Sequence, residues 1–187
     1  MTSGTVPVRR WVLFWAIALG GAAFDLITKA VIFARVGPPG STQTVIPDIL
    51  ELHTSHNTGA LWGFGRGMPH SSLIFAALSI VAAAAICYWL FVRGAASDAS
   101  LTAALGLIMA GALGNCYDRL VFGYVRDFVH FHVDAIGFDC AIFNFADNML
   151  VIGAITLMLL ALRPEPPTHP SESAEAVSPP TETVHSA

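Results

Sequence analysis

The sequence predicts an all-α integral membrane protein, a bundle of four transmembrane helices with a small cap that contains β-strands. Of its 187 residues, 55% are apolar and only 12% are charged, and the mean hydropathy is +0.64, which lies outside the range of ordinary soluble domains. A helix needs roughly 20 apolar residues to cross a hydrocarbon core about 30 Å thick. Apolar stretches of about that length span approximately residues 11–36, 71–92, 101–122 and 142–162.

The first of these helices is expected to remain in the membrane rather than to be cleaved. Arg9 and Arg10 precede it, as in a signal peptide, but its apolar run is longer than a typical signal-peptide core and carries Asp25 and Lys29 where a small-residue cleavage site would lie. Only the short segment 93–100 joins the second and third helices, which permits little besides an antiparallel hairpin. Four helices joined in this way place both termini on one side of the membrane.

Basic residues near the helix ends indicate which side that is. Cytoplasmic loops carry an excess of lysine and arginine. A small excess of basic residues flanks the helices on the side of the termini, namely Arg9, Arg10, Arg93 and Arg163. The side of the termini is therefore favoured as the cytoplasmic side.

The two loops on the opposite side, about residues 37–70 and 123–141, are expected to form the cap. The first alternates polar and apolar residues around a proline, a pattern typical of short strands. In the second, His130 and His132 alternate with phenylalanines, which predicts a strand with both imidazoles on one face. A metal site there would need further ligands, and Asp134 is the only obvious addition. Hydrogen bonding is therefore favoured over metal binding at these histidines.

Composition also bears on partners and on domain organisation. The nine Lys and Arg residues are scattered singly, so the chain has no basic stripe that would neutralise a phosphate backbone, and no nucleic-acid partner is expected. The chain has three cysteines and seven histidines but neither a C-x-x-C nor an H-E-x-x-H motif, so the commonest zinc-binding signatures are absent from the sequence. Residues 164–187 are rich in Pro, Ser and Glu, which predicts a disordered tail after a transmembrane domain spanning residues 1–163.

Ionisable residues inside membrane segments are costly and therefore mark candidate functional positions. Asp25 and Lys29 are four residues apart on one face of the first helix, where they can form an ion pair. A structural lock between helices and a functional role are both open for this pair.

Asn115, Asp118 and Arg119 share roughly one face near the outer end of the third helix. Small residues beside them, such as Gly111 and Gly114, allow a neighbouring helix to approach closely. This group is either a polar clamp between helices or part of a site that holds a polar partner.

The fourth helix begins with Asn144, a candidate N-cap, and Asp147, which lies one turn inside the helix and is expected to be too deep for a routine cap. Asp127 lies just beyond the third helix, on the side where the fourth begins, so Asp127 and Asp147 are expected at similar depth in the membrane. Two neighbouring carboxylates share a proton. One can then deprotonate a water molecule while the other polarises a carbonyl group, which is the division of labour in aspartic proteolysis.

These motifs, taken together, resemble the lipoprotein signal peptidase (signal peptidase II) family of aspartic membrane peptidases. The resemblance covers nearly the whole chain up to residue 163 and rests on blocks that occur in the family's order. The blocks are Asp25-Leu-Ile-Thr-Lys29, His56-Asn-Thr-Gly-Ala60, Gly114-Asn-Cys-Tyr-Asp-Arg119, Val125-Arg-Asp-Phe128 and Phe143-Asn-Phe-Ala-Asp147.

The resemblance implies a role for each matching residue. Asp127 and Asp147 would be the catalytic aspartates, and Asp25 and Lys29 would brace the first helix. The first outer loop would correspond to the family's β-cradle and periplasmic helix. The residues that would line or support the substrate site are Asn57, Gly59, Asn115, Asp118, Arg119, Asn144 and Ala146.

By the same resemblance the substrate would be a diacylglyceryl-modified prolipoprotein, cut before its lipidated cysteine to release the signal peptide. The enzyme would be a monomer in contact with membrane lipid in the bacterial cytoplasmic membrane, with cytoplasmic termini and an active site near the periplasmic face. No metal or organic cofactor would be required.

Three positions depart from the pattern of the signal peptidase II family. Cys116 and Arg126 occupy positions where apolar residues are expected, and Asn148 replaces a usual small residue.

Two functions other than proteolysis are also open. Membrane carboxylates relay protons in transporters, although transporters tend to place them near the midplane between repeated halves. A small proton-coupled transporter and a non-catalytic assembly subunit are therefore the alternative functions.

Overall fold

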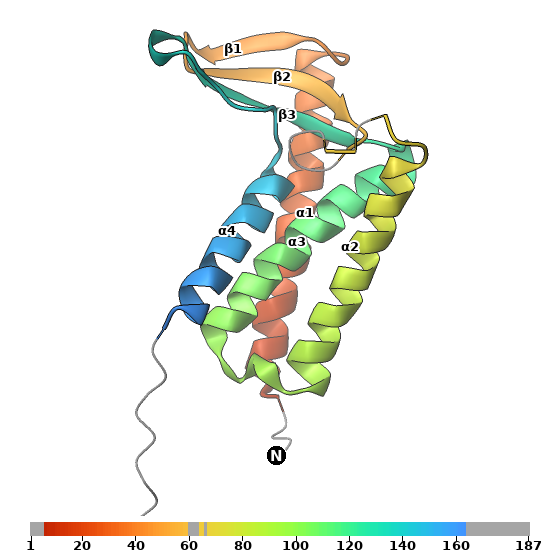
Figure 1. The fold of residues 1–187 in the computed structure, drawn as a ribbon, viewed down its shortest axis with the longest axis vertical. Coiled ribbons are helices and arrows are strands. Elements are labelled where there is room, and N and C mark those ends of the chain that lie inside the picture. Colours follow the sequence, from red (N-terminus) through yellow and green to blue (C-terminus); the bar gives the residue numbers. More distant parts are fainter. Residues whose placement is uncertain (1–5, 60–63, 66, 164–187) are drawn as a thin grey trace, which may run out of the picture.

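The computed structural model describes residues 6–59, 64–65 and 67–163 of the chain. Its main helices are α1 (Val8–Val36), α2 (Ser71–Cys87), α3 (Ala99–Phe122) and α4 (Phe145–Ala161), which lie in a bundle beneath a small sheet (Figure 1). A π-helical turn, η2 (Tyr88–Val92), continues α2, and the short 3₁₀ helix η3 (Ala95–Ser97) leads into α3.

Three of these helical segments are long and apolar enough to cross a membrane: Val8–Val36, Ser71–Val92 and Ala99–Phe122. The apolar helix α4 has 17 residues and is shorter. The expectation that the fourth helix starts near residue 142 is wrong, because Phe143 pairs with a strand instead. Its backbone exchanges hydrogen bonds with Val129 at 2.8 and 3.0 Å, and the helix begins only after Asn144.

The cap is a four-stranded antiparallel sheet with the order β1-β2-β3-β4. Its strands are β1 (Thr42–Ile46), β2 (Leu50–Asn57), β3 (Val125–Val133) and β4 (Phe138–Asp139), with the 3₁₀ turn η4 (Asp134–Ile136) between the last two. The predicted strand through both histidines is therefore confirmed in β3. The sequence assigns the periplasmic helix only to the first outer loop, about residues 37–70, of which residues 60–63 and 66 lie outside the described residues.

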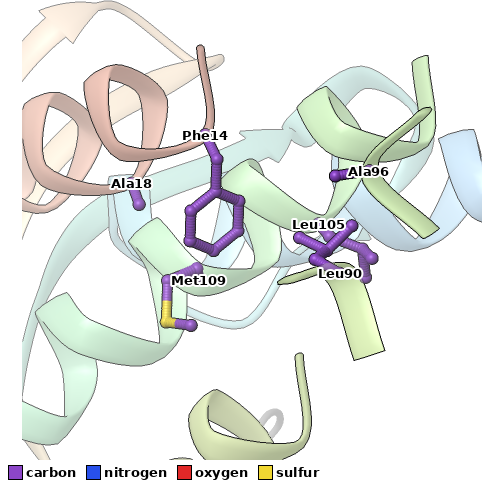
Figure 2. Packing of buried hydrophobic residues seen from close by; sticks show 6 residues of the cluster. All are labelled: Phe14, Ala18, Leu90, Ala96, Leu105 and Met109. Atoms are coloured by element: carbon purple, nitrogen blue, oxygen red, sulfur yellow. The ribbon is translucent and has the colours of Figure 1, made fainter. Parts of the chain in front are cut away.

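The bundle has an apolar half and a polar half. Away from the sheet, Phe14 of α1 packs against Met109 of α3 within a buried cluster that also contains Ala18, Leu90, Ala96 and Leu105 (Figure 2). Toward the sheet, the same buried face of α1 continues with Asp25 and Lys29, both 0% exposed.

The outer surface of the helices is apolar, opposite to a soluble bundle. Val12 is 62% exposed, Val81 65% and Ile152 53%. In the middle of α1 the charged groups Asp25 and Lys29 are thus turned inward, while apolar groups face outward, the arrangement expected of a protein surrounded by lipid.

The helix α3 packs against α1, α2 and α4 and forms the centre of the bundle. Its small residues make these contacts close, as the sequence predicts. A Cβ atom added at Gly114 would lie 2.6 Å from Oδ2 of Asp25, and one added at Gly111 would collide with Ala146 and Leu150 of α4. The close approach of α1 and α4 to α3 brings their polar residues to one level below the sheet.

Candidate active site

Asp127 is positioned by the turn that converts α3 into β3. Gly123 ends the helix in the left-handed region at a φ of 81°, and its N–H donates to the carbonyl of Arg119 at 3.2 Å. This is a glycine helix terminus. The chain then enters β3, where Asp127 pairs with Ser55 of β2. Asp127 is only 2% exposed, because it lies between the sheet and the helix ends.

Asp147 is held in the first turn of α4 by a capping box with Asn144. The Asn144 side chain accepts a hydrogen bond from the N–H of Asp147 at 3.0 Å, and Oδ2 of Asp147 accepts one from the N–H of Asn144 at 3.1 Å. Our expectation that Asp147 lies too deep for a routine cap is therefore wrong. The reciprocal bonds satisfy two free amides of the helix start and fix the direction of the carboxylate.

Two asparagines connect the carboxylates into one network. Nδ2 of Asn144 donates to Oδ1 of Asp127 at 2.6 Å and to Oδ1 of Asn115 at 3.2 Å. Nδ2 of Asn115 donates to Oδ1 of Asp147 at 2.8 Å. The predicted convergence of Asp127 and Asp147, 20 positions apart, is thus seen as an amide bridge.

The environment of Asp127 favours its protonated form. Burial and, second, the negative charge of Asp147 raise the pKa of Asp127 from 3.8 to about 7, against the opposing hydrogen bonds from Asn144 and Asn57. The Asn57 amide donates to Oδ2 of Asp127 at 3.1 Å. A carboxyl group with this pKa can hold a proton near neutral pH and can donate a hydrogen bond.

A buried ion network supports the pair from below. Nζ of Lys29 lies 2.7 Å from Oδ2 of Asp25 and 3.3 Å from Oδ2 of Asp118, and it donates to Oδ1 of Asn115 at 2.9 Å. Oδ1 of Asp25 accepts the N–H of Ala146 at 2.9 Å. The expected ion pair in α1 is therefore present, and it links α1 to both α3 and the start of α4.

Arg126 completes this network at the sheet, although the sequence marked it only as a departure. Its guanidinium contacts both carboxylate oxygens of Asp118 at 2.8 to 3.3 Å, and its backbone N–H donates to Oδ2 at 3.0 Å. The sequence shows the alternation in β3 and the outer end of α3. Arg126 meets Asp118, eight positions earlier, only because the chain reverses at the Gly123 turn, which the sequence pattern does not show.

Arg119 holds the loop after β2 rather than an aspartate. Among the described residues, its guanidinium donates to the carbonyls of Gly59 at 2.9 Å and of Asn115 at 3.5 Å. The N–H of Gly59 in turn donates to Oδ1 of Asn57 at 2.9 Å. Arg119 therefore positions the segment that carries Asn57, whose amide contacts Asp127. The negative charges of Asp127 and Asp147 also interact with the Arg119 guanidinium, at longer range.

Two apolar pockets open on either side of Asp147. One, of about 330 Å³, is lined by Asn57 and Asp147 together with Phe131, Cys140, Ala141, Ile142, Phe143, Asn148 and Val151. The other, of about 350 Å³, lies between α2, α3 and α4, and Asn115, Arg119 and Asp147 line it together with seven other residues, including Phe75, Leu78 and Leu150. Asn148, the departure from the family pattern that lies in α4, thus faces a pocket. Cys116, the remaining departure, is buried between α3 and α2, where its thiol donates to the carbonyl of Ala76 at 3.7 Å.

Apolar helices that enclose two amide-bridged carboxylates define a helical membrane protein with a paired-carboxylate site. A model of signal peptidase (SPase) II matches residues 17–163 of the chain. The chain therefore belongs to the signal peptidase II family, a family of peptidases.

Relatives and solved structures agree with this assignment. The lipoprotein signal peptidase of Rhodopirellula baltica is 39% identical over 82% of this chain and 73% of its own length, and that of Staphylococcus aureus is 35% identical over 79% and 86%. Two solved chains described as bacterial membrane enzymes are 31% and 30% identical, with TM-scores of 0.68 and 0.67. They cover 87% of this chain, which covers 92% and 98% of theirs.

Proposed function

We propose that this chain is an aspartic endopeptidase that removes the signal peptide from diacylglyceryl-modified prolipoproteins by cutting before the lipidated cysteine. Membership in the signal peptidase II family establishes the class of activity, release of signal peptides from prolipoproteins. The observation that carries the catalytic type is the amide bridge through Asn144 and Asn115 between the carboxylates of Asp127 and Asp147.

In the proposed reaction the two carboxylates divide the proton transfers. Asp127, whose pKa is raised to about 7, donates its proton as a hydrogen bond to the scissile carbonyl oxygen. The ionised Asp147 takes a proton from a water molecule, whose oxygen attacks the carbonyl carbon and forms a tetrahedral intermediate. That proton then passes to the departing amine as the C–N bond breaks. Asn57 and Asn144 orient Asp127, and Asn115 orients Asp147.

The two pockets that share Asp147 suit a substrate with two apolar parts. A lipidated cysteine carries acyl chains on one side of the scissile bond, and the signal peptide contributes an apolar helix on the other. Both pockets expose mainly apolar atoms and converge on the same carboxylate. Binding energy from both parts can therefore hold the scissile bond next to the catalytic pair.

The proposed topology has four membrane spans with the sheet at the periplasmic face. The described chain begins and ends at the end of the bundle away from the sheet (Figure 1), so both termini would be cytoplasmic. The 17 residues of α4 extend only about 25 Å at a rise of about 1.5 Å per residue, and local thinning of the bilayer would accommodate this length. The enzyme would act as a monomer, and residues 1–163 would suffice for activity. The tail expected from the sequence at residues 164–187 lies outside the described residues.

Product analysis tests this function directly. Purified chain in detergent is incubated with a prolipoprotein in two forms, with and without the diacylglyceryl group, and the products are weighed by mass spectrometry. We expect a single cut before the modified cysteine in the lipidated form only. The Asp48→Asn variant is a matched control, because Asp48 is exposed on the cap and has a φ of 60°, which asparagine also tolerates. It should cleave like the unmodified chain, and a cut at another bond or equal cleavage of both forms would overturn the proposal.

A further inference from the structure

We propose that the cap holds a second site, a three-ligand site for a divalent transition ion of the Zn²⁺ class formed by Glu51, His130 and His132. One ligand atom from each of these residues lies within 4.8 Å of the others. Asp127 belongs to the same strand as the two histidines, but it is three residues before His130, so alternation along β3 directs their side chains to opposite faces of the sheet. No step of the proposed peptidase reaction uses Glu51, His130 or His132.

Sheet register brings the three ligands together. Glu51 of β2 is directly opposite His130 in the β2–β3 ladder, and His132 is two residues further along β3. Side chains at such positions share one face of a sheet. Oε2 of Glu51 lies 3.8 Å from Nδ1 of His130, close to the roughly 3.3–3.5 Å that separates two ligands of a tetrahedral zinc ion bound at about 2.0–2.1 Å. A small side-chain rotation completes the approach.

Each imidazole has one nitrogen available for an ion and the other engaged. Nδ1 of His130 and Nε2 of His132 are buried atoms without a hydrogen-bond partner among the described residues. Nε2 of His130 lies 2.7 Å from Oδ1 of Asp139, and Nδ1 of His132 lies 2.9 Å from Oδ1 of Asp134. Metal-binding histidines typically donate their second N–H to a carboxylate in this way, which fixes the ring and increases its basicity.

Charge also suits a cation. The carboxylates of Glu51, Asp134 and Asp139 surround two imidazoles. A pocket of about 320 Å³, lined by both imidazoles and both aspartates but not by Glu51, opens beside the rings. Two imidazoles and one carboxylate favour Zn²⁺, Co²⁺ or Ni²⁺ over the all-oxygen sites of Mg²⁺ and Ca²⁺. Three ligands leave a position for water. The bound ion would link β2 to β3 and, through Asp139, to β4.

The hydrogen bonding that the sequence favours at the two histidines is present, to Asp139 and Asp134. The proposal adds metal binding, which the sequence did not favour, at the other nitrogen of each ring. Asp134 was the only additional ligand visible there, and it contacts His132 rather than completing the site. The missing ligand, Glu51, is 79 positions before His130 and becomes apparent only from the strand pairing.

Metal titration of tag-free, full-length protein tests the site. Protein in detergent is stripped with a chelator and titrated with Zn²⁺ alone, and bound metal is counted after dialysis. A parallel titration with Co²⁺ reports the ligand geometry by visible absorption. We expect one tightly bound ion per chain and a cobalt spectrum typical of four-coordinate nitrogen and oxygen ligands. Absence of stoichiometric binding would overturn the proposal.

Variants separate this site from adventitious binding. His132→Asn and Glu51→Gln should each lose at least about tenfold in Zn²⁺ affinity, and Asp134→Asn, which keeps all three ligands, should lose about tenfold. His70→Asn removes an exposed histidine elsewhere, at a left-handed position with a φ of 57°, and should bind like the unmodified chain, as should Asp127→Asn. Equal affinity in all variants, or an equal loss in His70→Asn, would contradict the assignment. Metal-free thermal unfolding verifies that each variant folds, and Asp134→Asn serves as the test if a ligand variant does not.

Discussion

Asn144 contacts both carboxylates of the candidate active site, through its side-chain amide to Asp127 at 2.6 Å and through its backbone N–H to Asp147 at 3.1 Å. One residue therefore acts at once as a helix cap and as the bridge of the pair. The geometry of catalysis and the start of α4 are consequently linked.

Replacing Asn144 by alanine should reduce cleavage far more than it reduces stability. The lost cap costs about 1 kcal/mol, whereas loss of the donor to Asp127 misplaces the pair and should lower kcat by about 10²-fold or more. Asp98→Ala is the matched control. Asp98 caps α3 at the opposite end of the bundle by accepting from the N–H groups of Ser100 and Leu101 at 2.7 and 3.0 Å. If both variants lose the same activity, Asn144 acts only as a cap.

The pH dependence of cleavage should report the protonated form of Asp127. A carboxyl group with a pKa of about 7 is protonated below that pH and ionised above it, so kcat/KM should fall as the pH rises through about 7. The hydrogen bond from Asn57 favours the ionised form and lowers this pKa. Asn57→Ala should therefore move the falling limb to higher pH, and Gln43→Ala, an exposed change on β1, should leave it in place. A rate that instead rises through pH 7 would make Asp127 the base.

Arg126 should prove essential for stability. Asp118 is 0% exposed and has a two-pronged contact with the Arg126 guanidinium, with Lys29 as its second cation. Arg126→Met would leave the buried carboxylate with Lys29 and the backbone N–H of residue 126 as its partners among the described residues. The expected loss of unfolding free energy is about 3 kcal/mol. Arg126→Lys keeps the charge but loses the fork, so an intermediate loss is expected. Thermal or denaturant unfolding in detergent measures both, and an unchanged midpoint in Arg126→Met would refute this role.

Close helix packing should make Gly114 intolerant of a single methyl group. The added Cβ would lie 2.6 Å from Oδ2 of Asp25, which would displace the Asp25–Lys29 pair and cost about 1–3 kcal/mol. Gly20→Ala in α1 meets nothing within 4 Å, so the same change there should be neutral or slightly stabilising. Unfolding midpoints of the two variants test the contrast, and similar values would show that α1 and α3 can separate without cost.

The parts of the site that the sequence predicts are those fixed by local spacing. Asp25 and Lys29 are four residues apart in one helix, and β3 alternates residue by residue, so their geometry follows from the period of a helix or strand. The convergence of Asp127 and Asp147 follows from the direction of two apolar helices. No knowledge of side-chain contacts was needed for these predictions.

The missed features all depend on contacts between distant segments. Whether Phe143 starts a helix or pairs with a strand is decided by Val129, which its backbone meets only after folding. Glu51 and His130 become neighbours through the β2–β3 register. The ion pair of Arg126 with Asp118 requires the turn at Gly123. In each case the hydrophobic pattern sets the elements, while the backbone pairing selects the partners.

Cleavage of a diacylglyceryl prolipoprotein by Asp127→Asn and Asp147→Asn tests the central claim most directly, with Asp48→Asn as the control and thermal unfolding as a check of folding. We predict that the control cleaves at the rate of the unmodified chain and that each dyad variant is slower by at least about 10³-fold, because neither carboxyl group can substitute for the other in the proton transfers. Equal cleavage by all three variants would contradict the account and would leave these aspartates as structural members of the bundle.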